Sequence, residues 1–270
     1  MSCIACNAGD SAMGRSATSS KMGSNVEISR SAFNPPNKVS YTLSKTISLK
    51  KGKPENVQID IDFKNKSKTI PKVYNPKAIN MFDFHCQEYP NITTLYPNLQ
   101  STAYIVKKHH GNSFLSVLYV ENKAVNEDRY RIVYSHGSSS DLGTGLSLIY
   151  TLSYLLKCDV ISYDYSGYGA STGVASEEEL KTDLQSVLRF LRISLNIHFS
   201  SLILFGYSIG SIPTILEGGK EPYCSKILGI MLLSPMVNEI SNYLDVGKNS
   251  PKKEKPKEEP ENNLDLVKEI

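Results

Sequence analysis

Leu-Ile-Leu-Phe-Gly-Tyr-Ser-Ile-Gly, at residues 202–210, is the stretch of this chain that decides the fold. Its first four residues form an apolar run typical of a buried strand, and the apolar residues within 212–216 predict a short helix directly after it. The turn between them has the pattern Gly-x-Ser-x-Gly, with Gly206 and Gly210 on either side of Ser208. Two glycines let the backbone reverse sharply, which lifts the serine hydroxyl off the end of the sheet. The motif therefore predicts a strand, a tight turn and a helix, with Ser208 as a nucleophile at the turn.

Strand and helix patterns alternate on both sides of this turn. Continuous apolar runs predict buried strands, and apolar residues spaced three or four apart predict helices. The expected order is a hairpin over 102–120, a strand at 131–135, a helix over 142–155, a strand at 160–163, a helix over 177–191, the 202–210 strand and turn, and a strand at 227–233. Because these strands are apolar throughout, we expect them to be buried on both faces. The pattern indicates the α/β class, with a mostly parallel sheet and helices on both of its faces.

The chain divides into an expected core and two polar ends. Of its 270 residues, 1–55 are rich in Ser, Gly, Asn and Lys without a sustained period, which predicts a disordered, basic amino-terminal arm. The expected core is 56–240, and the Lys/Glu/Pro-rich residues 241–270 predict a charged, disordered tail. No pattern of a buried strand follows Pro235. We therefore expect a core that is truncated after its sixth strand.

Charge and composition argue against several classes of protein. A net charge of +3, with basic residues that do not alternate with aromatic ones, argues against nucleic acid as a partner. Five cysteines at irregular spacing, with no secretory leader ahead of them, predict no disulfide framework and indicate a cytoplasmic location. The longest apolar run, 227–233, is far shorter than the ~20 residues of a membrane-spanning helix. We expect no metal and no other cofactor.

A nucleophilic serine attacks a carbonyl carbon, so its site needs hydrogen-bond donors for the oxyanion that forms. One expected donor is the backbone amide of Ile209, which follows the serine at the start of the helix. The other is the backbone amide of Ser138, in the loop that follows the 131–135 strand. In that same loop His136 and Gly137, and after the next strand Asp164, are expected to hold the loops in shape and not to transfer protons.

The sequence does not provide the histidine that is expected to act as the base for Ser208. A serine hydroxyl becomes nucleophilic when an imidazole takes its proton, and a carboxylate orients that imidazole. In the α/β-hydrolase fold the chain order is serine, acid, histidine. Every histidine of this chain precedes the serine: His85, His109, His110, His136 and His198. Glu239 and Asp245 follow the last expected strand and are the candidates for the acid.

Several blocks of the chain, in matching order, resemble the α/β-hydrolase domain-containing protein 17 family. They are Tyr134-Ser135-His136-Gly137, Asp141-Leu142-Gly143, Ser162 to Gly169, Gly206 to Gly210 and Leu233-Ser234-Pro235, with a fainter match at Phe33-Asn34-Pro35-Pro36. The resemblance implies an α/β-hydrolase fold. It also implies that the carboxy-terminal part of the family domain, which carries the acid and the histidine, is absent here.

The resemblance further implies a membrane-associated serine hydrolase that removes palmitoyl groups from protein cysteines, an acyl-protein thioesterase. Its substrates would be acyl esters or S-acylated proteins. The family is tethered by acylated cysteines at its amino terminus, to which Cys3 and Cys6 correspond in position, although unmodified cysteines in a polar arm are the alternative. One acyl chain together with a basic arm would bind the cytosolic face of a membrane.

Two functions stay open from the sequence. The first is a serine hydrolase lineage whose triad is incomplete in this chain, which is therefore inactive as it stands. The second is a non-catalytic pseudo-hydrolase that keeps the pocket and binds an acyl group or a protein partner. A third possibility is that the chain does not fold stably, because the apolar strand at 227–233 would be an open sheet edge.

Overall fold

The computed structural model describes residues 32–47, 55–59, 79–125 and 129–236. Cys3, Cys6, Glu239, Asp245 and the expected tail at 241–270 lie outside the described residues, as does most of the expected arm. Within the described ranges, no helix has both the length and the apolar character that crossing a bilayer requires.

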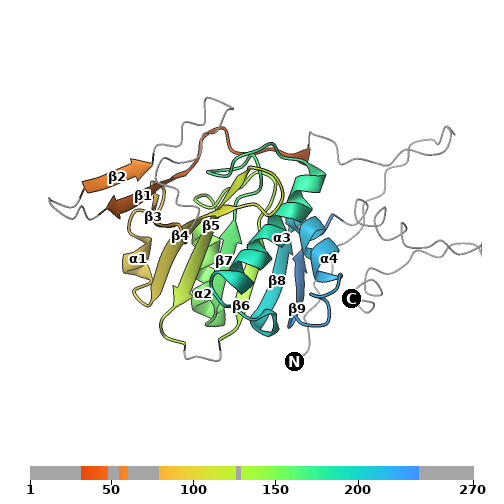
Figure 1. Cartoon of the computed structure of the whole chain (residues 1–270). Helices are drawn as coiled ribbons and strands as arrows, with labels where there is room; N and C mark the ends of the chain where they lie inside the picture. Colours follow the sequence, from red (N-terminus) through yellow and green to blue (C-terminus); the bar gives the residue numbers. More distant parts are fainter. Residues whose placement is uncertain (1–31, 48–54, 60–78, 126–128, 237–270) are drawn as a thin grey trace, which may run out of the picture.

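A nine-stranded sheet runs through the molecule in the order β2-β1-β3-β4-β5-β7-β6-β8-β9 (Figure 1). The strands are β1 (Tyr41–Ile47), β2 (Glu55–Ile59), β3 (Met81–Cys86), β4 (Leu99–Lys107), β5 (Phe114–Asn122), β6 (Arg131–Ser135), β7 (Asp159–Tyr163), β8 (Leu202–Tyr207) and β9 (Gly229–Leu233). The helices are α1 (Ile92–Leu95), α2 (Leu146–Leu156), α3 (Glu177–Ile193) and α4 (Ser211–Gly218), with single 3-10 turns η2 (Phe199–Ser201) and η3 (Ser208–Gly210). Strands β7, β6, β8 and β9 pair in parallel, and the pairings from β2 to β5 and between β5 and β7 are antiparallel.

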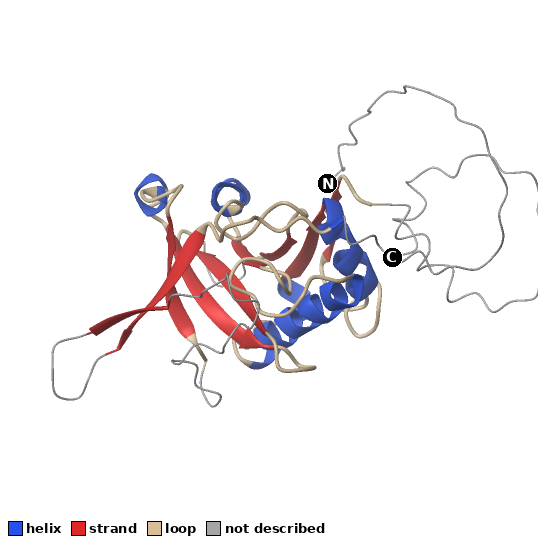
Figure 2. Cartoon of the chain, turned by 90° about the horizontal axis from the view of Figure 1, so that it is seen from above, coloured by secondary structure: helices blue, strands red, loops and turns tan. Residues whose placement is uncertain are grey.

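Helices cover both faces of this sheet. Seen from above, α3 and α4 lie on one side and α1 and α2 on the other (Figure 2). The apolar strand residues alternate between two buried clusters: Val133 and Leu204 face α3 and α4, whereas Ile132 and Phe205 face α2. This alternation is why the strand sequences are apolar without a break. The expected α/β architecture and the α/β-hydrolase fold are confirmed.

The parallel strands decide where the site lies. Because β6, β7 and β8 run in the same direction, the loops that follow them meet at one edge of the sheet. These loops carry the expected oxyanion residue Ser138, then Asp164, and then Ser208.

One expectation about the amino-terminal arm is wrong. Tyr41–Ile47 lies inside the stretch expected to be disordered, yet it forms β1, which pairs with β3 and β2. Tyr41 and Leu43 are buried, and the Tyr41 ring stacks on Phe84 of β3 with centroids 4.6 Å apart. The local alternation of apolar residues is too short to signal a strand, so the partner strand supplies the stabilisation.

The expectation that the 227–233 strand is buried on both faces is also wrong. β9 pairs only with β8 among the described residues, so it is the edge of the described sheet. Ile230 and Leu232 pack on the α4 side, while Met231 and Leu233 are 40% and 49% exposed on the other face. An apolar run predicts a strand, but it does not show whether other elements cover both faces of that strand.

Candidate active site

Ser208 occupies the sharp turn that the motif predicts. It follows β8 directly and is the first residue of η3, and α4 begins three residues later. Its φ angle is +52°, in the left-handed region that residues with a side chain rarely adopt. A strained serine between a parallel strand and a helix is the geometry of a nucleophile elbow.

Close backbone packing explains the glycines around Ser208. A Cβ atom on Gly206 would lie 2.5 Å from the carbonyl oxygen of Gly210 and 2.7 Å from Cα of Ser211. A Cβ atom on Gly210 would overlap the carbonyl group of Ser135, at the end of β6. Both glycines are therefore required for α4 to start so close to the sheet.

The loop after β6 lies against this turn. A Cβ atom on Gly137 would lie 3.0 Å from the Tyr207 ring and 3.9 Å from Cβ of Ser208. The loop residue Ser138 and the elbow residue Ile209 are thus on neighbouring segments. Their assignment as oxyanion donors stays a prediction.

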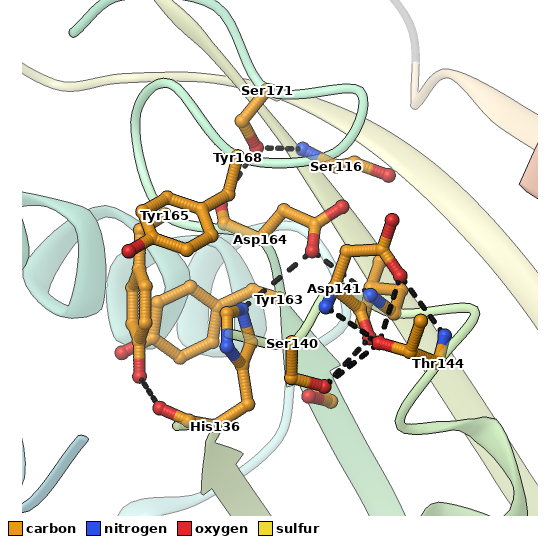
Figure 3. Close-up of polar contacts among 12 residues, drawn as sticks. Ser116, His136, Ser140, Asp141, Thr144, Tyr163, Asp164, Tyr165, Tyr168 and Ser171 are labelled. Atoms are coloured by element: carbon orange, nitrogen blue, oxygen red, sulfur yellow. Dashed lines mark hydrogen bonds and ion pairs between the residues drawn. The ribbon is translucent and has the colours of Figure 1, made fainter. Parts of the chain in front are cut away.

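His136 is buried behind this loop, with only 1% of its surface exposed. Its Nδ1 lies 2.8 Å from the carbonyl oxygen of Gly137. Its Nε2 has no hydrogen-bond partner among the described residues and lies 3.6 Å from Oδ1 of Asp164 (Figure 3). The ring packs on Tyr165, with centroids 4.3 Å apart. Both ring nitrogens therefore face groups other than the Ser208 hydroxyl.

Asp164 is a completely buried carboxylate that connects several segments. Its Oδ1 accepts a hydrogen bond of 2.9 Å from the amide of Leu142, and its Oδ2 accepts one from the Tyr41 hydroxyl. Burial raises the pKa of Asp164, whereas the nearby His136 opposes this rise. Asp164 therefore lies beside His136, and the contacts described for its carboxylate are with Tyr41, Leu142 and His136.

The other four histidines are exposed and far from the elbow in the fold. His85 is on β3, which four strands separate from β8. His109 and His110 lie in the turn between β4 and β5, and three strands separate β4 from β8. His198 precedes β8 at the end opposite to Ser208. The structure thus places the expected nucleophile and oxyanion residues on neighbouring segments, and the His136 ring beside them contacts Gly137 and Asp164.

A buried ion cluster near the site was not singled out in the sequence. Lys108, whose side chain is 2% exposed, pairs with Glu179 and Asp183 of α3 and donates to the Ser166 hydroxyl at 3.1 Å. Asp183 also accepts from the Ser166 amide at 2.6 Å. Burial raises the pKa of Asp183 to about 6, although Lys108 opposes this. One signal was available: Asp183 interrupts the apolar stripe of a strongly amphipathic helix.

Tyr41 was missed for a different reason. Its contact with Asp164 joins positions 123 residues apart, and neither local pattern nor spacing indicates such a contact.

The described part of the chain contains no group of three or more His, Cys, Asp or Glu side chains placed to hold a metal ion.

Comparisons with known proteins show what this chain resembles. No family model matches the chain. The alpha/beta hydrolase domain-containing protein aho-3 of Caenorhabditis elegans is 37% identical over 107 residues, which are 40% of this chain and 32% of the relative. Alpha/beta hydrolase domain-containing protein 17C of Xenopus laevis is 35% identical over 122 residues, 45% of this chain and 39% of the relative. The human 17C protein is 37% identical over 106 residues, 39% of this chain and 32% of the relative.

The chain therefore spans between 32% and 39% of the length of these relatives. Solved structures with a similar trace include an alpha-beta hydrolase from Vibrio vulnificus, with a TM-score of 0.42 and 21% identity over 56% of this chain and 50% of that one. Esterase LipW from Mycobacterium marinum has a TM-score of 0.43 and 19% identity over 56% of this chain and 48% of that one. The chain has the α/β-hydrolase fold, and its matched part resembles alpha/beta hydrolase domain-containing protein 17.

Proposed function

We propose that this chain carries the nucleophile and the oxyanion pocket of a serine hydrolase that acts on acyl esters or thioesters. The observation that carries the proposal is the backbone of Ser208, held at a φ of +52° between a parallel strand and a helix. In this role the Ser208 hydroxyl attacks the acyl carbon, and the amides of Ser138 and Ile209 donate to the oxyanion. An acyl-enzyme forms as the alcohol or thiol leaves.

We further propose S-acylated proteins as the substrate class. Support comes from the similarity to the alpha/beta hydrolase domain-containing protein 17 relatives. On this proposal Cys3 and Cys6 are acylated and, with the basic arm, bring the chain to the cytosolic face of a membrane. Glu239 and Asp245 remain the candidates for the acid.

The missing partner is the base. His136 has both ring nitrogens directed at Gly137 and Asp164. His85, His109 and His110 lie three or four strands away from β8, and His198 lies at the end of β8 opposite to Ser208. Without an imidazole to take its proton, a serine hydroxyl is a poor nucleophile at neutral pH. We therefore propose that these 270 residues by themselves acylate slowly and do not turn over substrate.

An exogenous imidazole should replace the missing base. In 200 mM imidazole, the chain is expected to accelerate release of p-nitrophenol from p-nitrophenyl acetate by at least about 10-fold over its rate without imidazole, within the usual range for general-base catalysis. Release is followed by absorbance. Because imidazole itself cleaves this ester, the Ser208→Ala variant measures the background that must be subtracted. A palmitoyl-thioester peptide tests the substrate class under the same conditions.

Each outcome decides a different part of the proposal. If wild type and Ser208→Ala cleave the ester at the same rate in imidazole, Ser208 is not a nucleophile. If the wild type turns over substrate without imidazole, the claim that the chain lacks a base is wrong. If the palmitoyl peptide binds but is not cleaved even in imidazole, the pocket is that of a pseudo-hydrolase that holds an acyl group.

A further inference from the structure

The segment that leads into β1 crosses the edge of the sheet at which the site lies. Residues 32–41, which we call the amino-terminal strap, run along the top of the molecule in Figure 1, above the loops that follow the parallel strands. Ala32 and Phe33 pack against the apolar cluster on the α3 side of the sheet, whereas Tyr41 belongs to the cluster on the α2 side. The strap thus passes from one face of the sheet to the other across the candidate site.

The first half of the strap contacts the oxyanion loop through Tyr168. Burial raises the pKa of Tyr168 to about 12, and the backbone of Asn34 opposes this rise. The Tyr168 hydroxyl donates at 2.9 Å to the carbonyl oxygen of Ser138. Tyr168 is fully buried, and its ring packs on His136, with centroids 5.6 Å apart. One tyrosine therefore links the strap to the residue whose amide is the expected oxyanion donor.

The second half of the strap contacts the same loop farther along. Ser40 donates its amide to Oδ2 of Asp141 at 3.0 Å and its hydroxyl to Oδ1 of the same carboxylate. Asp141 in turn accepts the amide of Thr144 at 2.9 Å. A Cβ atom on Gly143 would overlap the Ser40 hydroxyl, so glycine at 143 leaves the space that the strap fills.

Tyr41 ends the strap at the buried His136 and Asp164 pair. Its hydroxyl donates to Oδ2 of Asp164 and accepts the amide of Ala170 at 2.9 Å. Asp164 then has two donors, Tyr41 and the Leu142 amide. Its carboxylate also lies beside the Nε2 of His136 (Figure 3). A buried carboxylate that keeps its donors keeps one orientation, because losing a donor leaves an unpaired charge in an apolar setting.

We propose that the amino-terminal strap is a positioning element of the site and that Tyr41 is its main positioning residue, which fixes Asp164 and, through it, His136 and the oxyanion loop at 136–138. This inference rests on the proposed function, because only that function makes the loop at 136–138 an oxyanion loop. Tyr41 touches no reacting atom. Its hydroxyl keeps Asp164 in one place, Asp164 keeps the His136 ring in place, and His136 holds the Gly137 carbonyl whose neighbour is Ser138. The strap therefore determines where the Ser138 amide points.

The chain offers a matched control for Tyr41. Tyr119 of β5 also donates its hydroxyl to a fully buried aspartate, Asp159, at 2.6 Å. Asp159 begins β7, so this second pair lies at the edge of the sheet opposite to Ser208. Tyr41→Phe and Tyr119→Phe therefore remove the same kind of bond at opposite ends of the sheet.

Two measurements separate positioning from plain stability. Amide hydrogen exchange is expected to accelerate at Leu142 and Ala170 in Tyr41→Phe by at least about 10-fold, and to stay unchanged there in Tyr119→Phe. In imidazole, the limiting rate of Ser208 acylation is expected to fall about 10-fold or more in Tyr41→Phe, because small misplacement of a donor is costly. The half-saturating ester concentration should stay the same, since no ester-binding group is removed.

A second variant covers the case in which Tyr41→Phe does not fold. Tyr168→Phe removes the hydrogen bond to the Ser138 carbonyl oxygen and is expected to lower the acylation rate in the same way. The proposal is overturned if the folded variants keep the exchange rates of Leu142 and Ala170 and the acylation rate of the wild type, or if Tyr119→Phe changes them equally. Should the wild type not acylate at all, the proposed function fails, and the exchange data alone still decide whether the strap holds the loop.

Discussion

Replacing Gly210 with alanine is expected to lower the free energy of unfolding by about 3 kcal/mol or more, at the upper end of the usual cost of overpacking. The added methyl group would overlap the Ser135 carbonyl group and lie 2.9 Å from the carbonyl oxygen of His136. All of these atoms belong to the backbone, so no flexible side chain can move aside. Either α4 shifts away from the sheet or the end of β6 moves. Urea unfolding followed by circular dichroism measures the loss.

Gly229 is the matched control for this substitution. It begins β9, the strand beside β8, and a Cβ atom there meets nothing within 4 Å. Gly229→Ala is therefore expected to change stability by no more than about 0.5 kcal/mol. Equal effects of the two substitutions would contradict the packing that we describe at the elbow.

Removing the carboxylate of Asp183 is expected to have a comparable effect. Asp183→Ala leaves the buried Lys108 ammonium with only Glu179 as a charged partner, and leaves the Ser166 amide without its acceptor. Loss of one partner of a buried ion pair costs about 3–5 kcal/mol, because the remaining charge is left in a poorly solvated site. The loss should be measured by urea unfolding near pH 8, well above the raised pKa of Asp183, which is about 6.

An exposed ion pair tests whether burial is the cause. Lys123 pairs with Glu121 on the surface, and its side chain is 50% exposed. Lys123→Ala is expected to lower the free energy of unfolding by at most about 1 kcal/mol.

The buried pair of Lys108 and Asp183 should be strongly coupled. Lys108→Met combined with Asp183→Asn should lower the free energy of unfolding by less than the two single substitutions added together, since no unpaired charge then stays buried. Additive losses would show that Lys108 and Asp183 act independently.

The parts of the fold that sequence predicts are those with a strong local signal. Most residues of the runs at 131–135, 160–163 and 202–205 are buried in the structure, in β6, β7 and β8, because a strand covered on both faces is mostly apolar. The elbow was predictable for a similar reason, since the close approach of α4 to β6 demands glycine at 206 and 210. The sequence therefore predicts those features that only a few residue types can satisfy, such as a buried strand or a glycine in close contact with another backbone segment.

The contacts that depend on distant partners were not predictable in this way. β1 has two buried apolar residues, Tyr41 and Leu43, which is too little for a local signal, and it forms because β3 is available to pair with it. Lys108 looks like an ordinary charged residue at the end of a strand, and only the fold shows that Asp183 lies beside it. For the same reason the sequence could not show that the strap reaches Asp164.

The measurement that tests the central claim most directly is peptide mapping by mass spectrometry after the chain has reacted with a fluorophosphonate probe in imidazole. We predict one covalent adduct, on the peptide that contains Ser208, formed faster in imidazole than in a buffer of the same pH without it. The Ser208→Ala variant should carry no adduct. An adduct on another serine, or no adduct under any of these conditions, would contradict the assignment of Ser208 as the nucleophile, and labelling at the same rate without imidazole would contradict the absence of a base.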